Sequence, residues 1–350
     1  MERYIGLDVH KQSCTMAVVG SSGRRLRSLV LETNATVLVE ALRGIAGSRR
    51  LCMEEGTQCE WLYEALEPHV DELAVIQPEK RCGSKNDAID AWDLAERIRT
   101  RKWTKRVVKS PLRFSMLREA VRAYDVTNRD VTRAKNRLNA LFRARGIAIT
   151  PHIYSSPADR ETAFRKLKAP QRLRAECLAA QLDAMLPTRD RAENWLLEQA
   201  HKLPEVGRVM SAPGIGPIRA ATIVAIVVNP ERFRKKQQFW SYSGLGIVTH
   251  SSADWQRDQN RRWLRRQRAQ PRGLNRNCNR CLKNVFKGAA MHVIRMPEHP
   301  LRLAYDRMLE NGIKPNLARL TIARRIASAV LAIWKHKEEY DPARHSSKAA

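Results

Sequence analysis

The sequence predicts an α/β domain at residues 1–105, a helical coiled-coil arm at 106–205 and a small, mostly α-helical domain at 206–350. Three observations support this division. Short apolar segments between polar turns come first, long stretches with apolar residues at helical spacing follow, and a glycine-rich turn before an apolar helix opens the last part. A chain of 350 residues with 43% hydrophobic content is long enough to build two cores and a connecting arm.

The first domain begins with three segments typical of antiparallel β-strands, at Tyr4–Lys11, Cys14–Val19 and Leu26–Glu32. Asp8 lies inside the apolar run of the first segment. A carboxylate there costs free energy unless hydrogen bonds or charge satisfy it, and a metal ion is one way to do so. Three antiparallel strands with an acid in the first are what a ribonuclease H-like core requires, although an aspartate taken alone is more often structural.

Three further acids follow at the ends of predicted elements. The expected elements are a helix at Ala35–Ala46, a strand at Arg50–Met53, a helix at Glu60–Leu66, a strand at Glu72–Pro78 and, after a polar loop, a helix that holds Asp87–Ala91. Glu54 directly follows a strand, and Asp87 and Asp90 share one face of their helix because residues three apart lie side by side. Together with Asp8, these carboxylates can hold a pair of magnesium ions for phosphoryl transfer. The alternative for the two aspartates is an ordinary helix start, where the helix dipole favours acids.

The blocks that contain these acids resemble the DEDD-type transposases of the insertion-sequence 110 group, whose relatives include the Piv-type DNA invertases. The blocks are Gly6–Lys11, Glu54–Thr57 and Asn86–Ala91. The resemblance implies a bacterial enzyme with a ribonuclease H-like (RuvC-like) nuclease fold. It also implies that the four acids which bind Mg²⁺ are Asp8, Glu54, Asp87 and Asp90. Glu55 is the alternative to Glu54, one position further along.

The composition indicates a nucleic-acid partner. Lys and Arg total 64 against 36 acidic residues, which gives a formal net charge of +28. A chain this basic usually binds a polyanion, because each neutralised phosphate releases condensed counterions. Neither a membrane-spanning stretch nor a secretory signal is apparent, so we expect a cytoplasmic protein. The seven cysteines are expected to be reduced, and the lone Cys278–Cys281 pair predicts no zinc site.

Two long helical stretches make up the middle of the chain. Phe114–Ala148 predicts one helix that Pro151 ends, and Ala158–Lys202 predicts a second helical region interrupted by Pro170 and Pro187. Folded back on each other, they would form an antiparallel arm. Periodicity does not separate a dimerisation device from a spacer, nor an RNA-binding face from a solvated one. The family resemblance implies a coiled coil and a homo-oligomer, either a dimer or a tetramer.

The last domain opens with a turn around Gly214 and Gly216, before an apolar helix at Ala220–Val228. Such a turn is similar to a helix-hairpin-helix turn, in which glycines let the backbone approach a phosphate near a helix N-terminus. Glycine turns are also common without any ligand. The C-terminal helix is expected at Leu317–Trp334.

By the same family resemblance, Ser252 is the candidate nucleophile and Ser251 is its alternative; Ala253 replaces the glycine that the family usually has next. A dense basic stretch with Trp263 inside it follows. Its arginines can bind phosphates and its indole can stack on a base, although a solvated charge run is the alternative. The candidate nucleic-acid-binding arginines are Arg257, Arg261, Arg262, Arg265 and Arg266.

Together with the resemblance, these features predict a DNA transposase or site-specific recombinase that a structured RNA guides. Acids and serine from different subunits would form its composite site. One alternative is a metal-only nuclease or Holliday-junction resolvase-like enzyme in which Ser252 is incidental. Another is a non-catalytic nucleic-acid-binding relative.

Overall fold

The computed structural model describes residues 1–78, 87–103, 105–107, 112–250, 255–259, 261–265 and 270–342. The chain divides into two compact units, Met1–Leu112 and Arg113–Ala350. Each unit has its own hydrophobic cores, and the long helices of the predicted arm belong to the second unit. Among the described residues, no helix is both long enough and apolar enough to cross a lipid bilayer.

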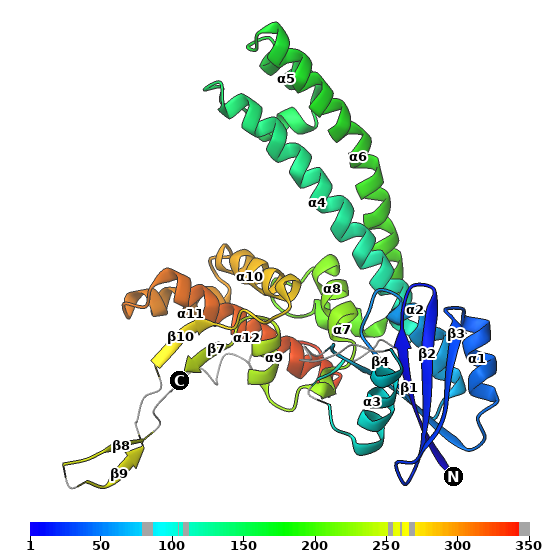
Figure 1. Cartoon of the computed structure of the whole chain (residues 1–350). Helices are drawn as coiled ribbons and strands as arrows, with labels where there is room; N and C mark the ends of the chain where they lie inside the picture. Colours follow the sequence, from blue (N-terminus) through cyan, green and yellow to red (C-terminus); the bar gives the residue numbers. More distant parts are fainter. Residues whose placement is uncertain are drawn as a thin grey trace. The chain divides into compact units, whose positions relative to one another are not determined.

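The first unit contains a six-stranded mixed sheet in the order β3-β2-β1-β4-β5-β6, of which β1 to β4 are labelled in Figure 1. The strands are β1 (Glu2–Val9), β2 (Ser13–Gly20), β3 (Arg25–Glu32), β4 (Ser48–Glu54), β5 (Glu72–Ile76) and β6 (Arg106–Val107). Strands β1, β2 and β3 are antiparallel, which confirms the predicted three-stranded start; β4 and β5 run parallel to β1, and β6 is antiparallel to β5. This mixed α/β sheet is compatible with a ribonuclease H-like fold. The short edge strand β6 was not predicted.

Helices cover both faces of this sheet. They are α1 (Ala35–Arg43), α2 (Cys59–Leu66) with the 3-10 turn η1 (Glu67–His69), and α3 (Asp87–Thr100). Alternate residues of β1 point to opposite faces. Ile5 and Leu7 therefore join the core that α1 and α2 cover, whereas Tyr4 packs with residues of α3. Asp8 has the parity of Tyr4, so its side chain lies on the α3 face of the sheet.

Gly6 sets how closely α3 approaches β1. A Cβ atom at this position would lie 1.9 Å from the carbonyl oxygen of Ala91 and 2.5 Å from the amide nitrogen of Ala95. Both are backbone atoms of α3, so only glycine permits this contact. The close approach places the first turn of α3, with Asp87 and Asp90, beside the end of β1.

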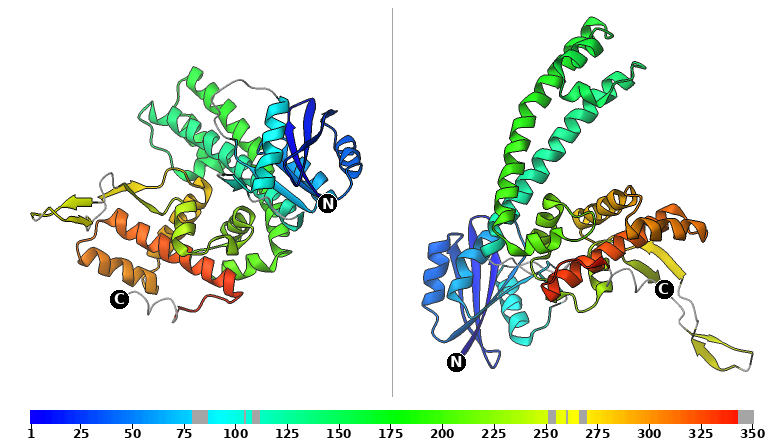
Figure 2. Two further views of the ribbon diagram at one scale, coloured as in Figure 1. Left: turned by 60° about the horizontal axis from the view of Figure 1, so that its bottom comes forward. Right: turned by 180° about the vertical axis from the view of Figure 1, so that it is seen from behind.

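The second unit begins with two long helices, α4 (Ser115–Arg143) and α6 (Ala169–His201), which lie side by side over much of their length (Figures 1 and 2). The connection at their far end holds η3 (Pro151–Tyr154) and α5 (Pro157–Phe164). Buried side chains join the two long helices, including Leu138 and Phe142 of α4. The antiparallel pair is thus present, while its description as a coiled coil stays a prediction.

Two expectations about the long helices are wrong. The helix expected to run to Ala148 ends at Arg143, as α4. The chain then turns at Gly146, which has a φ of 68°, before it reaches Pro151. α6 continues through Pro187, which was expected to interrupt it. A proline inside a helix costs about 3 kcal/mol, but Leu182 before it and Leu196 after it are both buried. We attribute the continuity of α6 to this packing on both sides of the proline.

A helical body completes the second unit. Its elements are α7 (Pro204–Met210), α8 (Pro217–Val227), η4 (Pro230–Arg232), α9 (Lys236–Tyr242), α10 (Arg280–Ile294), α11 (Pro300–Glu310) and α12 (Pro315–His336), with η2 (Leu112–Phe114) before α4. Helices α8, α10 and α12 contribute fully buried residues to one core, which also includes the base of the long helices. The predicted helices at 220–228 and 317–334 correspond to α8 and α12.

Two small antiparallel β-structures in the second unit were not predicted. Strand β7 (Ile247–His250) pairs with β10 (Gln270–Leu274), and β8 (Trp255–Arg257) pairs with β9 (Trp263–Arg265). The β8–β9 hairpin extends away from the helical body in every view (Figures 1 and 2). Within the basic run of the sequence, the described segments Trp255–Arg257 and Trp263–Arg265 therefore form a β-ribbon.

Candidate active site

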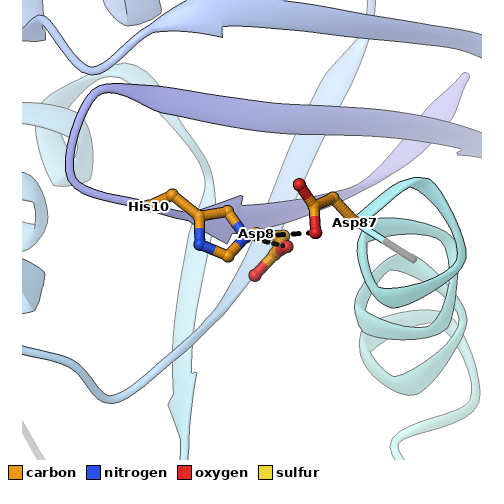
Figure 3. A group of neighbouring side chains, drawn as sticks. All are labelled: Asp8, His10 and Asp87. Atoms are coloured by element: carbon orange, nitrogen blue, oxygen red, sulfur yellow. Dashed lines mark hydrogen bonds and ion pairs between the residues drawn. The ribbon is translucent and has the colours of Figure 1, made fainter. Parts of the chain in front are cut away.

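Three side chains of the first unit converge where β1 ends and α3 begins (Figure 3). The Nε2 atom of His10 lies 3.0 Å from Oδ2 of Asp8 and 3.3 Å from Oδ1 of Asp87. One possible ligand atom from each residue lies within 4.8 Å of the others. The imidazole thus lies between two carboxylates that are 79 positions apart in the chain.

The backbone around His10 is held by the turn that joins β1 to β2. The amide of His10 donates to the carbonyl oxygen of Ser13 at 3.0 Å, and the hydroxyl of Thr33 donates to the carbonyl oxygen of His10 at 2.9 Å. On the other side, Asp87 is the first residue of α3, where the positive end of the helix dipole favours a carboxylate. A fixed turn and a packed helix therefore place the two carboxylates and the imidazole together.

Glu54 reaches the same site from the neighbouring strand. Asp8, His10 and Glu54 all line a pocket of about 560 Å³. The register of β1 and β4 pairs Gly6 with Cys52, and Cys52 packs on the α3 face of the sheet. Two residues further along, Glu54 has the parity of Cys52 and so shares the α3 face with Asp8.

Glu55, the alternative acid, also lines the pocket but follows the end of β4. Its backbone amide donates to the carbonyl oxygen of Ile76 at 2.8 Å. The alternation of side chains along β4 favours Glu54 over Glu55 as the partner of Asp8.

The electrostatics of the site disfavour a charged Asp8. Its side chain is 18% exposed. Burial raises the pKa of Asp8 above its ordinary value, the carboxylates of Asp87 and Asp90 add to the rise, and His10 opposes it. A positive charge at the site would stabilise the charged form of Asp8 against burial and against the neighbouring carboxylates. The donor set, carboxylate oxygens with one imidazole nitrogen, fits a divalent cation.

His10 was given no role from the sequence, although it was part of the first acidic block. The local feature of the sequence that could have indicated a role for His10 is its position two residues after Asp8. Residues two apart on an extended chain lie on the same face. Asp90 was expected beside Asp87. It lies in the first turn of α3, close enough for its charge to affect Asp8.

The two glycines of the candidate phosphate-binding turn differ in their surroundings. Gly214 has a φ of 70°, and a Cβ there would lie 2.6 Å from the carbonyl oxygen of Ala289 in α10. Arg219 donates to the carbonyl oxygen of Gly214 at 2.7 Å, which fixes the turn further. Packing against α10 therefore explains this glycine. A Cβ at Gly216, which precedes α8, would meet nothing within 4 Å, so its backbone lies open.

The candidate arginines belong to the β8–β9 hairpin. Arg257, Arg261 and Arg262 are exposed there, and Arg265 is the last residue of β9. The guanidinium of Arg257 lies 4.9 Å from the ring centroid of Trp263, a residue that is 60% exposed. Arg266, Ser252 and Ser251 lie outside the residues that the structure describes.

A mixed sheet with an acidic cluster at the end of its first strand is compatible with a ribonuclease H-like enzyme that cleaves nucleic acid. Comparison with protein families makes this class specific. The model of the DEDD transposases of the IS110 type matches residues 5–144, and the model described as "Transposase IS116/IS110/IS902 family" matches residues 206–306. The chain belongs to the IS110-type transposases, and it is a DNA-cleaving and recombining enzyme that uses divalent metal. The search among curated proteins finds no significant match.

Proposed function

We propose that this transposase cuts DNA with divalent cations, Mg²⁺ in the cell, held by Asp8, Glu54, Asp87 and Asp90. The convergence of Asp8, His10 and Asp87 beside Glu54 carries this proposal. When bound, a pair of such cations stabilises the attacking and the leaving oxygen of an in-line phosphoryl transfer. The chain contributes the carboxylates: Asp8 of β1 and Glu54 of β4 line the pocket, and Asp87 of α3 lies 3.3 Å from His10, which lines it too. Lys11 also lines that pocket and can contact a DNA phosphate.

The acids are tested by strand cleavage with binding measured in parallel. Asp90→Asn and Glu54→Gln should lower the cleavage rate by at least about 1000-fold, which is about 4 kcal/mol of transition-state stabilisation, and should leave DNA binding largely intact. Glu55→Gln is the matched control, because Glu55 lines the same pocket from the position after the strand. If Glu55→Gln abolishes cleavage and Glu54→Gln does not, the carboxylate ligand is Glu55.

For rejoining, we propose that Ser252 attacks the phosphodiester. A bond forms between its Oγ and phosphorus as a backbone P–O bond breaks, and a second strand end can reverse the step. The support is the resemblance to the family together with the transposase match over this segment. The acids and the serine would come from different subunits of a homo-oligomer. Exposed apolar side chains on the long helices, Val126 and Leu173 among them, support self-association.

A covalent protein–DNA adduct tests the serine. Denaturing the reaction while it proceeds should trap an adduct in the wild type and in Ser251→Ala, and Ser252→Ala should form none. An adduct lost only in Ser251→Ala would move the nucleophile by one position. If both variants recombine normally, the serine has no role in rejoining.

That last outcome would favour a metal-only nuclease or junction resolvase. One observation favours this alternative: the acidic cluster lies wholly within the first unit, so it forms without the segment that contains Ser252. Such an enzyme activates water, so its products carry free ends and no attached protein. The non-catalytic relative is set aside, because the chain belongs to a family of DNA-recombining enzymes.

We further propose that a structured RNA guides the enzyme to its target. The net charge of +28 and the exposed arginines of the β8–β9 hairpin support an RNA partner in addition to DNA. Purification of the full chain from cells that carry its own element tests this directly. One RNA species, sensitive to ribonuclease and identified by sequencing, should copurify. Recovery of heterogeneous cellular RNA alone would contradict guidance.

A further inference from the structure

His10 is positioned more firmly than a surface histidine needs to be. Its side chain is 51% exposed, yet Nε2 points at two carboxylates and its backbone is held on both its amide and its carbonyl side. The proposed function gives the acids a role as metal ligands but assigns none to this imidazole.

We infer that Nε2 of His10 is a ligand of the cation at this site, and that it makes the site bind Mn²⁺ more tightly than Mg²⁺. This inference rests on the proposed metal-binding role of Asp8 and Asp87. It adds a nitrogen donor to a set of oxygen donors.

The spacing of the donor atoms fits this role. Neighbouring ligands of an octahedral ion with bonds of ~2.1 Å are ~3.0 Å apart. The Nε2 atom of His10 lies 3.0 Å from Oδ2 of Asp8 and 3.3 Å from Oδ1 of Asp87. One ligand atom from each of the three residues lies within 4.8 Å of the others, so one cation can contact all three side chains.

The same distances also fit hydrogen bonds from a protonated Nε2, which would satisfy the carboxylates when no metal is bound. For ligation, the proton must be on Nδ1, so that the lone pair of Nε2 faces the metal. Because half of the His10 side chain is exposed, Nδ1–H can donate to water, a common partner for a metal-bound histidine.

The choice of cation follows from ligand chemistry. Mg²⁺ prefers oxygen ligands and retains much of its water. An imidazole nitrogen suits first-row transition metals, and Mn²⁺ also accepts carboxylates. A site with one nitrogen and several carboxylate oxygens therefore favours Mn²⁺ at equal concentration, while the more abundant Mg²⁺ can still support turnover.

The test uses Mn²⁺ and Mg²⁺ with the full chain in the absence of nucleic acid. Mn²⁺ binding is measured from the electron paramagnetic resonance signal of the free ion, Mg²⁺ binding by competition, and nitrogen ligation by ¹⁴N modulation in pulsed spectra of bound Mn²⁺. The variants are His10→Ala, Asp8→Asn and, as the matched control, His69→Ala. His69 lies in η1 of the same unit and is not among the residues that line the pocket.

The wild type and His69→Ala should bind Mn²⁺ more tightly than Mg²⁺ and show a directly coordinated imidazole nitrogen. His10→Ala should lose that nitrogen signal, and its Mn²⁺ affinity should fall at least about tenfold. Losing even an outer-shell hydrogen-bond partner of a metal ligand typically lowers metal affinity by about 10–100-fold, so losing a direct ligand should cost no less. Its Mg²⁺ affinity should change much less.

Bound Mn²⁺ without nitrogen coupling in the wild type would overturn the inference and leave His10 as a hydrogen-bond donor. Failure of the underlying metal site has a different result, because Mn²⁺ would then bind as tightly to Asp8→Asn as to the wild type.

Discussion

At the scale of single residues, the site illustrates how function lowers stability. Asp8 lies at the end of a buried strand, beside the carboxylates of Asp87 and Asp90, and its pKa is raised chiefly by burial. The folded protein therefore holds this carboxyl group in a place that disfavours its charged form. A cation removes the conflict, and the chain without metal retains it.

This conflict predicts a stability gain in Asp8→Asn. Because the folded-state pKa of Asp8 is above its unfolded value, the folded state binds more protons between the two values, and stability falls as pH rises through that window. With metal removed by a chelator, Asp8→Asn should gain roughly 0.5–2 kcal/mol at neutral pH, the range of single stabilising changes. The gain should vanish below the unfolded pKa of about 3.9. Urea denaturation across this pH range measures it.

Asp71 provides a control of opposite sign. The amide of Arg49 donates to its carboxylate, which lowers the pKa of Asp71, so its contribution to stability is present at neutral pH and lost as pH falls. Asp71→Asn should therefore lose stability at neutral pH. A loss of stability in both variants at neutral pH would contradict the account of Asp8.

At the scale of secondary-structure elements, the contact between β1 and α3 assembles the site. Asp8 comes from the strand and Asp87 and Asp90 from the helix, so their separation depends on how closely the two elements pack. Gly6 is the residue at the contact, against the backbone at Ala91.

Gly6→Ala should impair both folding and catalysis. The new methyl group would overlap backbone atoms of α3, which cannot rotate away as a side chain can, so the helix must shift. Overpacking of this kind typically costs about 1–3 kcal/mol. The shift also separates Asp87 and Asp90 from Asp8, so cleavage should be lost even under conditions in which the protein stays folded. Urea denaturation and strand cleavage are the two measurements.

Gly207→Ala is the matched control for this substitution. Gly207 is exposed in α7, and a Cβ there would meet nothing within 4 Å. The added methyl group should be neutral or raise stability by up to about 1 kcal/mol, because alanine favours helix over glycine. Wild-type cleavage by Gly6→Ala would show that the spacing between β1 and α3 does not control the site.

At the scale of the whole molecule, the excess of positive charge dominates the interaction with nucleic acid. With a net charge of +28, binding should weaken steeply as salt concentration rises. If the β8–β9 hairpin binds nucleic acid as we propose, the guanidinium of Arg257 would contact a phosphate and the exposed indole of Trp263 would stack on a base.

Salt titrations should separate these contacts. Arg257→Ala should make the slope of log K against log salt concentration shallower by about 0.9, the value for one phosphate contact with duplex DNA. Trp263→Ala should lower affinity for single-stranded nucleic acid by about 1–3 kcal/mol and leave the slope unchanged. Fluorescence anisotropy with labelled oligonucleotides measures both. Leu264→Ala is the control, since this neighbour is 50% exposed and points to the opposite side of the strand. Equal effects of Trp263→Ala and Leu264→Ala would exclude stacking.

The sequence by itself determined the features that depend on neighbouring residues. Apolar runs and turns predicted β1, β2 and β3, and helical spacing predicted α4 and α12, because hydrophobic periodicity is local. The acidic blocks are also short runs of neighbouring residues. Their resemblance to a family is confirmed by the match over residues 5–144. The positions of Asp8, Asp87 and Asp90 were thus available before any fold was known.

Only the tertiary structure decided how these parts meet. The register of β1 with β4 places Glu54, rather than Glu55, on the face of Asp8. The contact at Gly6 brings His10 and Asp87 together, and packing on both sides of Pro187 keeps α6 continuous. Each outcome depends on contacts between residues far apart in the chain. The free energies of these contacts exceed the local conformational preferences of the residues involved. Local periodicity carries no information about which distant backbone will lie against a given glycine or strand end.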